Sequence, residues 1–173
     1  MAFKSKCVFL DRDGVLNEDR PDYSYQLEHF KILPGVPQAL QQLKEAGYFL
    51  IVVTNQSGIS QGIYSQRDME ACHKYLQKEC EGVIDHFYFS PYHPKVTESL
   101  GRKPGTLLFE KGIAKFNIDP MNSWMIGDRE RDLIPAKQLG MRTVLINNET
   151  KSEGQWDFTA LDLATAAKKI LSK

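Results

Sequence analysis

The sequence contains few cysteines and no obvious way to pair them. Its three cysteines, Cys7, Cys72 and Cys80, are odd in number, lie far apart and form no Cys-x-x-Cys motif. Disulfide frameworks use even numbers of cysteines, and redox or metal motifs use closely spaced ones. We therefore expect three free thiols in a reducing cytoplasm.

Long hydrophobic runs and an excess of charge of one sign are also missing. No apolar run approaches the length of a transmembrane helix, and residues 1–6 lack the apolar segment and cleavage site of a secretory signal. Lys+Arg and Asp+Glu balance at 22 each, whereas proteins that track a duplex or bind a membrane surface usually carry a basic excess. We expect a cytoplasmic protein with no membrane or nucleic-acid partner.

The sequence does have the size and composition of a domain with a substantial core. It contains 173 residues, of which 42% are hydrophobic and 25% charged, as is ordinary for soluble globular proteins. It shows no internal repeat, no low-complexity segment and no domain boundary. We expect residues 1–173 to form a single domain.

Buried strands alternate with helices along the chain. Continuous apolar runs predict strands at residues 7–10, 48–53, 82–89, 124–126 and 143–146. Helical spacing and stop signals predict helices at residues 36–46, 66–80, 104–116, one ending near 139, and 161–171. Loops are expected at 17–33 (or a small hairpin), 90–103 and 147–157. The pattern predicts an α/β fold of three layers, a Rossmann-like parallel sheet with helices on both faces.

Two carboxylates end the first predicted strand. Asp11 and Asp13 follow an apolar run, and Gly14 permits a sharp turn after them. Because alternate residues share a side of a strand, both carboxylates would project the same way, and a cation between them would relieve their repulsion. The stretch suggests a metal-assisted reaction centre or, alternatively, a solvated Asp-Gly turn. An EF-hand calcium-binding loop is excluded, because it needs an oxygen ligand at its fifth position and a glycine at its sixth, and here these positions are Val15 and Leu16.

Polar residues also follow the second and fourth predicted strands. Thr54 and Asn55 end the second, and Asp128 ends the fourth. Ligands of open parallel sheets bind at the carboxyl ends of strands, so three polar clusters at one edge favour a binding site over separate solvated turns. Asp128 could complete an oxygen site for Mg²⁺, and Asp132 could hydrogen-bond a metal-bound water or a lysine. The alternative for these two acids is stabilisation of a helix N-terminus.

Anion-binding groups accompany these acids. Thr54 offers a hydroxyl and the Ser57-Gly58 turn offers backbone amides, although an ordinary polar turn would look the same. Lys103 would lie just before a helix that begins at Pro104, where it could supply positive charge to a phosphate or remain a solvated loop lysine. A metal, a cation, amide donors and two aspartates together suit phosphoryl transfer.

Four segments resemble, in order, the four motifs of haloacid dehalogenase superfamily phosphatases: residues 9–14 (FLDRDG), 53–56 (VTNQ), 102–104 (RKP) and 127–132 (GDRERD). The match spans nearly the whole chain, and four ordered motifs are more specific than any one alone. The longer strings at 11–17, 54–59 and 101–104 are most similar to the heptose 1,7-bisphosphate phosphatases and next to the histidinol-phosphatases.

The resemblance implies a role for each matching residue. Asp11 would attack phosphorus and form an aspartyl-phosphate, and Asp13 would protonate the leaving alkoxide and then activate water. Thr54 and Lys103 would hold the phosphoryl group. The metal ligands for Mg²⁺ would be Asp11, the backbone carbonyl of Asp13, and Asp128. Candidate contacts with the sugar or a second phosphate are Asp19, Arg20, Asp22, Tyr23, Asn55, Gln56, Ser57, Arg102 and Arg129.

Two features of the family bear on this chain. Many members carry a cap domain, but the gaps at residues 16–33 and 59–101 are too short for one, so we expect a capless fold shielded by loops 17–33 and 90–101. The related phosphatases usually have a zinc loop before the Arg-Lys-Pro motif. Here that loop has no cysteine and one histidine, His93, and tetrahedral zinc requires four such ligands. We expect no structural zinc.

The sequence as a whole predicts a monomeric Mg²⁺-dependent phosphatase of carbohydrate metabolism. Its expected substrate is a small phosphorylated sugar, above all the 7-phosphate of D-glycero-D-manno-heptose 1,7-bisphosphate. The alternatives are hydrolysis of histidinol phosphate and hydrolysis of a nucleic-acid 3′-phosphate. The balanced charge of the chain counts against the nucleic-acid substrate. A receiver-like phospho-accepting module is the alternative that is not an enzyme. It is disfavoured because the third predicted strand ends in Phe89 and Ser90, without an aspartate.

Overall fold

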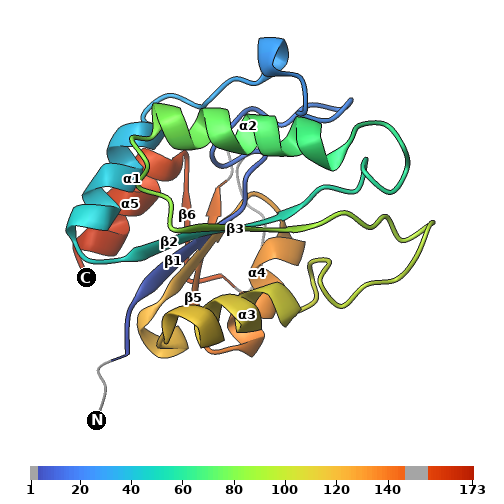
Figure 1. Ribbon diagram of the computed structural model, residues 1–173. Coiled ribbons are helices and arrows are strands. Elements are labelled where there is room, and N and C mark those ends of the chain that lie inside the picture. The colour runs from blue at the N-terminus through green and yellow to red at the C-terminus, as the bar shows by residue number, and fades with distance from the viewer. Residues whose placement is uncertain (1–3, 147–155) are drawn as a thin grey trace.

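The computed structural model describes residues 4–146 and 156–173, which form one parallel sheet covered by helices on both faces (Figure 1). The strands are β1 Cys7–Leu10, β2 Phe49–Asn55, β3 His86–Ser90, β4 Trp124–Gly127, β5 Arg142–Ile146 and β6 Phe158–Ala160. The helices are α1 Val36–Glu45, α2 Gln66–Glu79, α3 Leu107–Phe116, α4 Glu130–Gln138 and α5 Leu163–Leu171, with 3-10 turns at Leu27–His29 and Pro120–Asn122. The predicted α/β fold class is confirmed.

The strand order β3-β2-β1-β4-β5-β6 places β1 in the middle of the sheet. The chain moves outward from β1 through β2 to β3, and then returns to place β4 on the other side of β1. In parallel sheets of this kind, ligands bind beyond the carboxyl ends of the strands where the order reverses. Here that switch point lies between β1 and β4.

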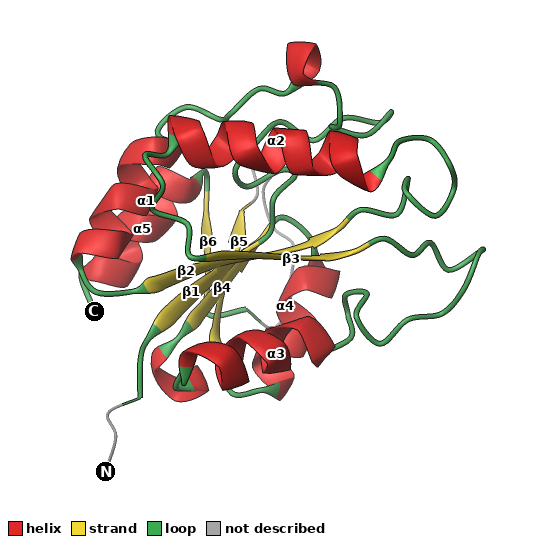
Figure 2. Ribbon diagram, in the orientation of Figure 1, coloured by secondary structure: helices red, strands yellow, loops and turns green. Residues whose placement is uncertain are grey.

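Helices α1, α2 and α5 cover one face of the sheet, and α3 and α4 cover the other (Figure 2). Val8 and Leu10 of β1 pack on the first group, whereas Cys7 and Phe9 pack on the second. All four residues of β1 are fully buried, which explains its continuous apolar run. Burying an aliphatic or aromatic side chain stabilises the fold by about 1.5–3 kcal/mol, so β1 is firmly anchored beneath its terminal aspartates.

The segment at 17–33, one of the two expected to shield the site, forms a loop and no hairpin. The predicted loop at 17–33 is closed by an antiparallel bridge between Asn17 and Ile32 and contains the turn Leu27–His29, without paired strands of a hairpin. The predicted loop at 147–157 lies largely outside the described residues.

Among the described helices, none is long and apolar enough to span a membrane. The three cysteines are free thiols, as predicted.

Two predicted elements start three residues or more too early, and one strand was not predicted. Strand β3 begins at His86 because Gln77 hydrogen-bonds both the amide and the carbonyl of Ile84, which holds the preceding residues in a turn. Helix α3 begins at Leu107, and Pro104 lies in the turn before it. Strand β6 was not expected: it has three residues, one of them exposed, and too little alternation to be recognised.

Candidate functional site

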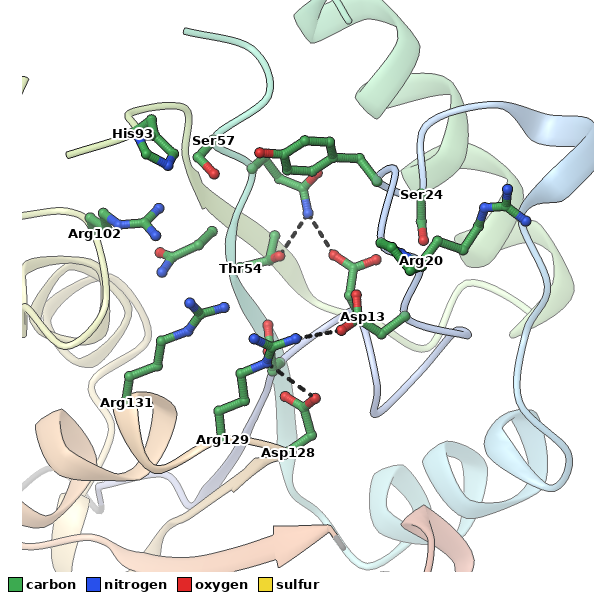
Figure 3. Close-up of a pocket in the computed structure, with 16 residues that line it drawn as sticks. Asp13, Arg20, Ser24, Thr54, Ser57, His93, Arg102, Asp128, Arg129 and Arg131 are labelled. Atoms are coloured by element: carbon green, nitrogen blue, oxygen red, sulfur yellow. Dashed lines mark hydrogen bonds and ion pairs between the residues drawn. The ribbon is translucent and has the colours of Figure 1, made fainter. Parts of the chain in front are cut away.

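A cavity of about 470 Å³ lies beyond the carboxyl ends of β1, β2 and β4, at the switch point of the sheet (Figure 3). Arg102, Arg131 and His93 lie on one side of it and Arg20 and Ser24 on the other. It is lined by Asp11, Asp13, Asp19, Arg20, Pro21, Tyr23, Ser24, Thr54, Asn55, Gln56, Ser57, His93, Arg102, Asp128, Arg129 and Arg131. The three polar clusters expected at one edge of the sheet do meet there.

Asp11 ends β1 and is almost completely buried. One carboxylate oxygen, Oδ1, lies 2.8 Å from Nζ of Lys103 and accepts the amide of Arg12 at 2.8 Å. Burial, together with the neighbouring acids Asp132 and Asp128, raises the pKa of Asp11 to about 8, and Lys103 opposes part of this rise. Asp11 is therefore a carboxylate in need of additional positive charge.

Asp13 points into the same cavity but is held by different partners. Its Oδ1 accepts hydrogen bonds from Arg12 at 2.9 Å and from the Asn17 amide at 2.8 Å. Its Oδ2 accepts one from Gln56 at 2.9 Å. Burial alone would raise the pKa of Asp13, but Arg12, Asn17 and Gln56 outweigh it and hold the pKa below its ordinary value. Two aspartates one residue apart thus have opposite pKa shifts. A carboxylate nucleophile needs a low pKa and a general acid a raised one, so these shifts suit that pair of roles only once a cation beside Asp11 and an anion beside Asp13 reverse them.

Gln56 organises the end of β2. Its amide nitrogen donates to both Thr54 Oγ1 and Asp13, and its carbonyl oxygen accepts the Tyr64 hydroxyl at 2.7 Å. The turn that follows depends on Gly58, because a Cβ there would lie 2.2 Å from the Tyr64 ring. Among the described residues, no partner is found for the backbone amides of Ser57 and Gly58. Thr54 and these amides are therefore available to an anion, as the sequence suggests, and the binding of one stays a prediction.

Lys103 is buried beneath the cavity. Its ammonium lies 2.8 Å from Asp11 and 2.8 Å from Asp132, and donates to the Val53 carbonyl at 2.7 Å. Asn55 fixes the lysine backbone by accepting its amide at 3.0 Å and donating to its carbonyl at 3.2 Å. Burial would lower the pKa of Lys103, but Asp11 and Asp132 outweigh it and raise the pKa. The proposed contact of Asp132 with a lysine is confirmed.

Three acids could hold a metal ion. Side-chain oxygens of Asp11, Asp128 and Asp132 lie within 4.8 Å of one another. Burial, followed by Asp132, raises the pKa of Asp128 to about 6, and its buried Oδ1 has no hydrogen-bond partner among the described residues. The absence of a side chain at Gly14 leaves room for the Asp128 carboxylate, because a Cβ there would lie 2.4 Å from Asp128 Oδ2. The raised pKa values of Asp11 and Asp128 and the unpartnered oxygen fit a hard divalent cation such as Mg²⁺.

The metal cluster differs from the expected ligand set in one residue. The sequence suggests the Asp13 backbone carbonyl, and the structure adds the carboxylate of Asp132. Asp132 already binds Lys103 and accepts the Arg129 amide at 3.0 Å, where it caps the start of α4. These two contacts hold Asp132 behind the cluster, so it suits the role of supporting the lysine better than that of a ligand.

The mouth of the cavity is strongly basic. Arg129 pairs with Asp19 at 2.6 Å and lies 3.7 Å from Asp128, while Arg102 donates to the carbonyl of Tyr92 at 3.1 Å. Asp22, expected at the site, pairs with Arg20 at 3.0 Å and is not among the residues that line the cavity.

Sequence reasoning missed several lining residues, notably Arg131, which joins the basic mouth, and His93, which was considered only as a zinc ligand. Arg131 did carry a signal: a cation in the first turn of a helix opposes the helix dipole, which suggests a role in binding.

Arg12 was also missed. It is fully buried, and its guanidinium donates to Asp13, donates to the Ser24 carbonyl at 2.7 Å, and lies 3.4 Å from Nε2 of His73. Burial and the charge of Arg12 lower the pKa of His73 to about 3, so that ring is neutral and can accept a hydrogen bond. No sequence pattern pairs residues 12 and 73, because their contact depends on how α2 crosses the sheet.

Known proteins resemble this chain in sequence and structure. Residues 15–146 match the family model of haloacid dehalogenase-like hydrolases. The D-glycero-beta-D-manno-heptose-1,7-bisphosphate 7-phosphatase of Haemophilus ducreyi is 37% identical over 82% of this chain and 82% of its own length. The protein of the same name from Helicobacter pylori is 35% identical over 88% of this chain and 90% of its own.

A solved structure agrees with these relatives. The D,D-heptose 1,7-bisphosphate phosphatase of B. bronchiseptica, crystallised with magnesium and phosphate, superimposes with a TM-score of 0.86 at 26% identity. The match covers 96% of this chain and 98% of that one. Sequence and fold therefore point to the same group of proteins.

Proposed function

The chain belongs to the haloacid dehalogenase-like hydrolases, and from this membership we propose that it is a Mg²⁺-dependent phosphatase of a small phosphorylated sugar. The favoured substrate is the 7-phosphate of D-glycero-D-manno-heptose 1,7-bisphosphate. The observation that carries the proposal is the arrangement of Asp11 and Asp13 after β1, in one cavity with Asp128 and with Lys103 2.8 Å from Asp11. Relatives that share most of the chain's length and are named for this substrate support it.

The reaction would proceed in two displacements. A carboxylate oxygen of Asp11 attacks phosphorus, a new O–P bond forms and the bond from phosphorus to the sugar oxygen breaks. The leaving oxygen keeps the electron pair and takes a proton from Asp13. Water then attacks the aspartyl-phosphate while Asp13 removes its proton, which releases phosphate and restores Asp11. Asp13 would start each cycle protonated, because a phosphate dianion beside it favours the neutral acid.

Asp11, Asp128 and the backbone carbonyl of Asp13 would hold Mg²⁺, which would neutralise charge on Asp11 and on the phosphoryl oxygens. Thr54 and the amides of Ser57 and Gly58 would bind those oxygens from the β2 side. Lys103 adds positive charge beneath Asp11, and its ion pair with Asp132 keeps it there. These groups are in place before substrate binds, as electrostatic stabilisation requires.

The basic mouth would select the rest of the substrate. Arg20, Arg102, Arg129 and Arg131 surround the same cavity, and arginine binds phosphate in a bidentate manner. Such a concentration of charge exceeds what one phosphate would need beside a metal and the positive charge of Lys103 beneath it. It therefore favours a bisphosphate over a monophosphate, with Asp19 and Tyr23 available to sugar hydroxyls.

We also propose that the loop after β3 needs no zinc. Hydrogen bonds hold it instead: the Ser60 amide donates to the Pro91 carbonyl at 3.1 Å, and the His93 amide donates to the Ser60 hydroxyl at 2.9 Å. His93 then accepts the Lys95 amide through Nδ1 at 3.1 Å. With these contacts, the loop presents His93 and Arg102 to the cavity without cysteine ligands.

The test is phosphate release with Mg²⁺ across heptose 1,7-bisphosphate, histidinol phosphate, hexose phosphates and a 3′-phosphorylated oligonucleotide. We expect the heptose bisphosphate to have the highest kcat/KM, and Asp11→Asn to abolish release from all four. A preference for histidinol phosphate or the oligonucleotide would overturn the proposed substrate but leave the proposed phosphatase mechanism in place. No release from any ester, by a folded protein that binds Mg²⁺, would overturn the phosphatase itself.

A further inference from the structure

A buried arginine connects the site to two other parts of the fold. Arg12 lies between Asp11 and Asp13, and its side chain has no exposure to solvent. A buried charge is tolerated only where partners replace the lost water. The partners of Arg12 lie at the end of β1, on the loop over the cavity, and on α2, so its position depends on all three.

The first of these partners is the carboxylate of Asp13. Nη2 of Arg12 donates to Asp13 Oδ1 at 2.9 Å and Nε does so at 3.3 Å. Asn17 and Gln56 also hold this carboxylate, but they are neutral amides. Arg12 is the charged partner, and charge-assisted hydrogen bonds are roughly twice as strong as neutral ones. Arg12 therefore dominates the orientation of Asp13.

The other two partners belong to loop 17–33 and to α2. Nη2 also donates to the carbonyl of Ser24, a residue that lines the cavity from loop 17–33. Nη1 lies 3.4 Å from Nε2 of His73, whose ring stacks on Phe87 with centroids 4.5 Å apart. His73 thus fixes one end of the guanidinium against α2 and β3. A lysine at residue 12 would have one nitrogen in place of the three that contact these partners, so it could not reproduce the planar, spread arrangement of the guanidinium donors.

We propose that Arg12 is the positioning residue of Asp13, and that His73 positions Arg12 in turn. The arrangement places the proton-transferring carboxylate in a fixed relation to loop 17–33, which carries Asp19, Arg20 and Tyr23 to the substrate. The proposal rests on the proposed function for its kinetic consequences. Its structural content, that Asp13 moves when Arg12 or His73 is lost, stands independently.

The leaving group provides a readout specific to Asp13. An alkoxide released from a sugar phosphate needs a proton from Asp13 as the P–O bond breaks. The p-nitrophenolate released from p-nitrophenyl phosphate is stable without one. Because kcat/KM reports the steps up to formation of the aspartyl-phosphate, a misplaced Asp13 lowers it for the alkyl ester and spares the aryl ester. A general loss of phosphate binding would lower both alike.

The experiment compares Arg12→Ala, Arg12→Lys and wild type on heptose 1,7-bisphosphate and p-nitrophenyl phosphate, with thermal melting to confirm folding. We expect Arg12→Ala to lose roughly 10²-fold in kcat/KM on the sugar ester, as for loss of a general acid, and less than about 10-fold on the aryl ester. Added guanidinium ion at millimolar concentration should restore the kcat/KM of Arg12→Ala on the sugar ester and leave that on the aryl ester unchanged. Arg12→Lys keeps the charge and one hydrogen bond, so its kcat/KM on the sugar ester should lie between those of Arg12→Ala and wild type. Equal losses on both esters would overturn the proposal.

The arm on His73 uses a matched pair of variants. His73→Phe keeps a ring that can stack on Phe87 but has no acceptor for Arg12, whereas His73→Gln keeps an acceptor. We expect His73→Phe to lose kcat/KM selectively on the sugar ester, less strongly than Arg12→Ala does. The kcat/KM of His73→Gln on that ester should lie closer to the wild-type value. Identical kinetics in both would remove His73 from the proposal.

The failure of the proposed function would be recognised separately. If wild type hydrolyses neither ester, the phosphatase assignment fails, and crystal structures of wild type and Arg12→Ala then decide the positioning role. A displaced Asp13 carboxylate in the variant supports the proposal, and an unmoved one overturns it.

Discussion

Lys103 and Asp11 form a buried ion pair of 2.8 Å that joins the loop before α3 to the end of β1. The lysine is the positive charge that opposes the effect of burial on the Asp11 pKa. It is itself held by Asp132 and by the backbone clamp of Asn55. The nucleophile that we propose therefore depends on a cation placed by three other segments of the chain.

Replacement of this lysine should impair the first chemical step. Lys103→Met removes the charge but keeps most of the side-chain volume. We expect a loss of roughly 10²–10³-fold in kcat, the size found when one electrostatic donor is removed from a reaction centre. Because the pKa of Asp11 would rise further, the remaining activity should increase with pH over a range where wild type is flat. An unchanged pH profile of kcat/KM would contradict this account of the pair.

The raised pKa of Asp11 makes a prediction about the stability of the metal-free protein. Its pKa rises from 3.8 to about 8 on folding, so between these values the folded state binds more protons than the unfolded state. Stability should therefore fall as pH rises through this window. The buried His73, with its pKa lowered to about 3, has the opposite effect below about pH 6.5. Thermal melting in EDTA between pH 6.5 and 8 isolates Asp11, and Asp11→Asn should flatten that slope.

The sequence was informative wherever one residue type decides the local structure. The apolar run of β1, the carboxylates after it and Asp128 after β4 could be located because the carboxyl ends of parallel strands meet at one edge. Their partners could not be found in this way. The contact of Arg12 with His73 depends on the crossing of α2, and the contact of Asp13 with Gln56 depends on the register of β1 with β2.

Gly14 should be required for the metal site as well as for the backbone. A Cβ at Gly14 would lie 2.4 Å from Asp128 Oδ2, and its φ of +83° disfavours any side chain. Gly62 is a matched control, because its φ is +70° and nothing lies within 4 Å of a Cβ there. Both alanine variants should lose about 1–2 kcal/mol to the left-handed backbone. Only Gly14→Ala should also abolish the increase in melting temperature that Mg²⁺ produces. Equal responses to Mg²⁺ would contradict the role assigned to Asp128.

Arg131 should distinguish a bisphosphate from a monophosphate. It lines the basic mouth from the first turn of α4, away from the aspartates. We expect Arg131→Ala to raise KM for heptose 1,7-bisphosphate roughly 10-fold, the loss of one hydrogen bond to a charged group, and to leave KM for a sugar monophosphate within about 2-fold. The exposed Arg67 on α2 provides a control for the change of net charge. Parallel changes with both substrates would remove Arg131 from recognition of a second phosphate.

The most direct test of the central claim is a single turnover with ³²P-labelled heptose 1,7-bisphosphate and Mg²⁺, stopped with acid before the reaction is complete. The account predicts a transient label on the protein, mapped by mass spectrometry to Asp11 and absent from Asp11→Asn. Phosphate released without any labelled protein, or a label on another residue, would contradict the proposal that Asp11 is the nucleophile.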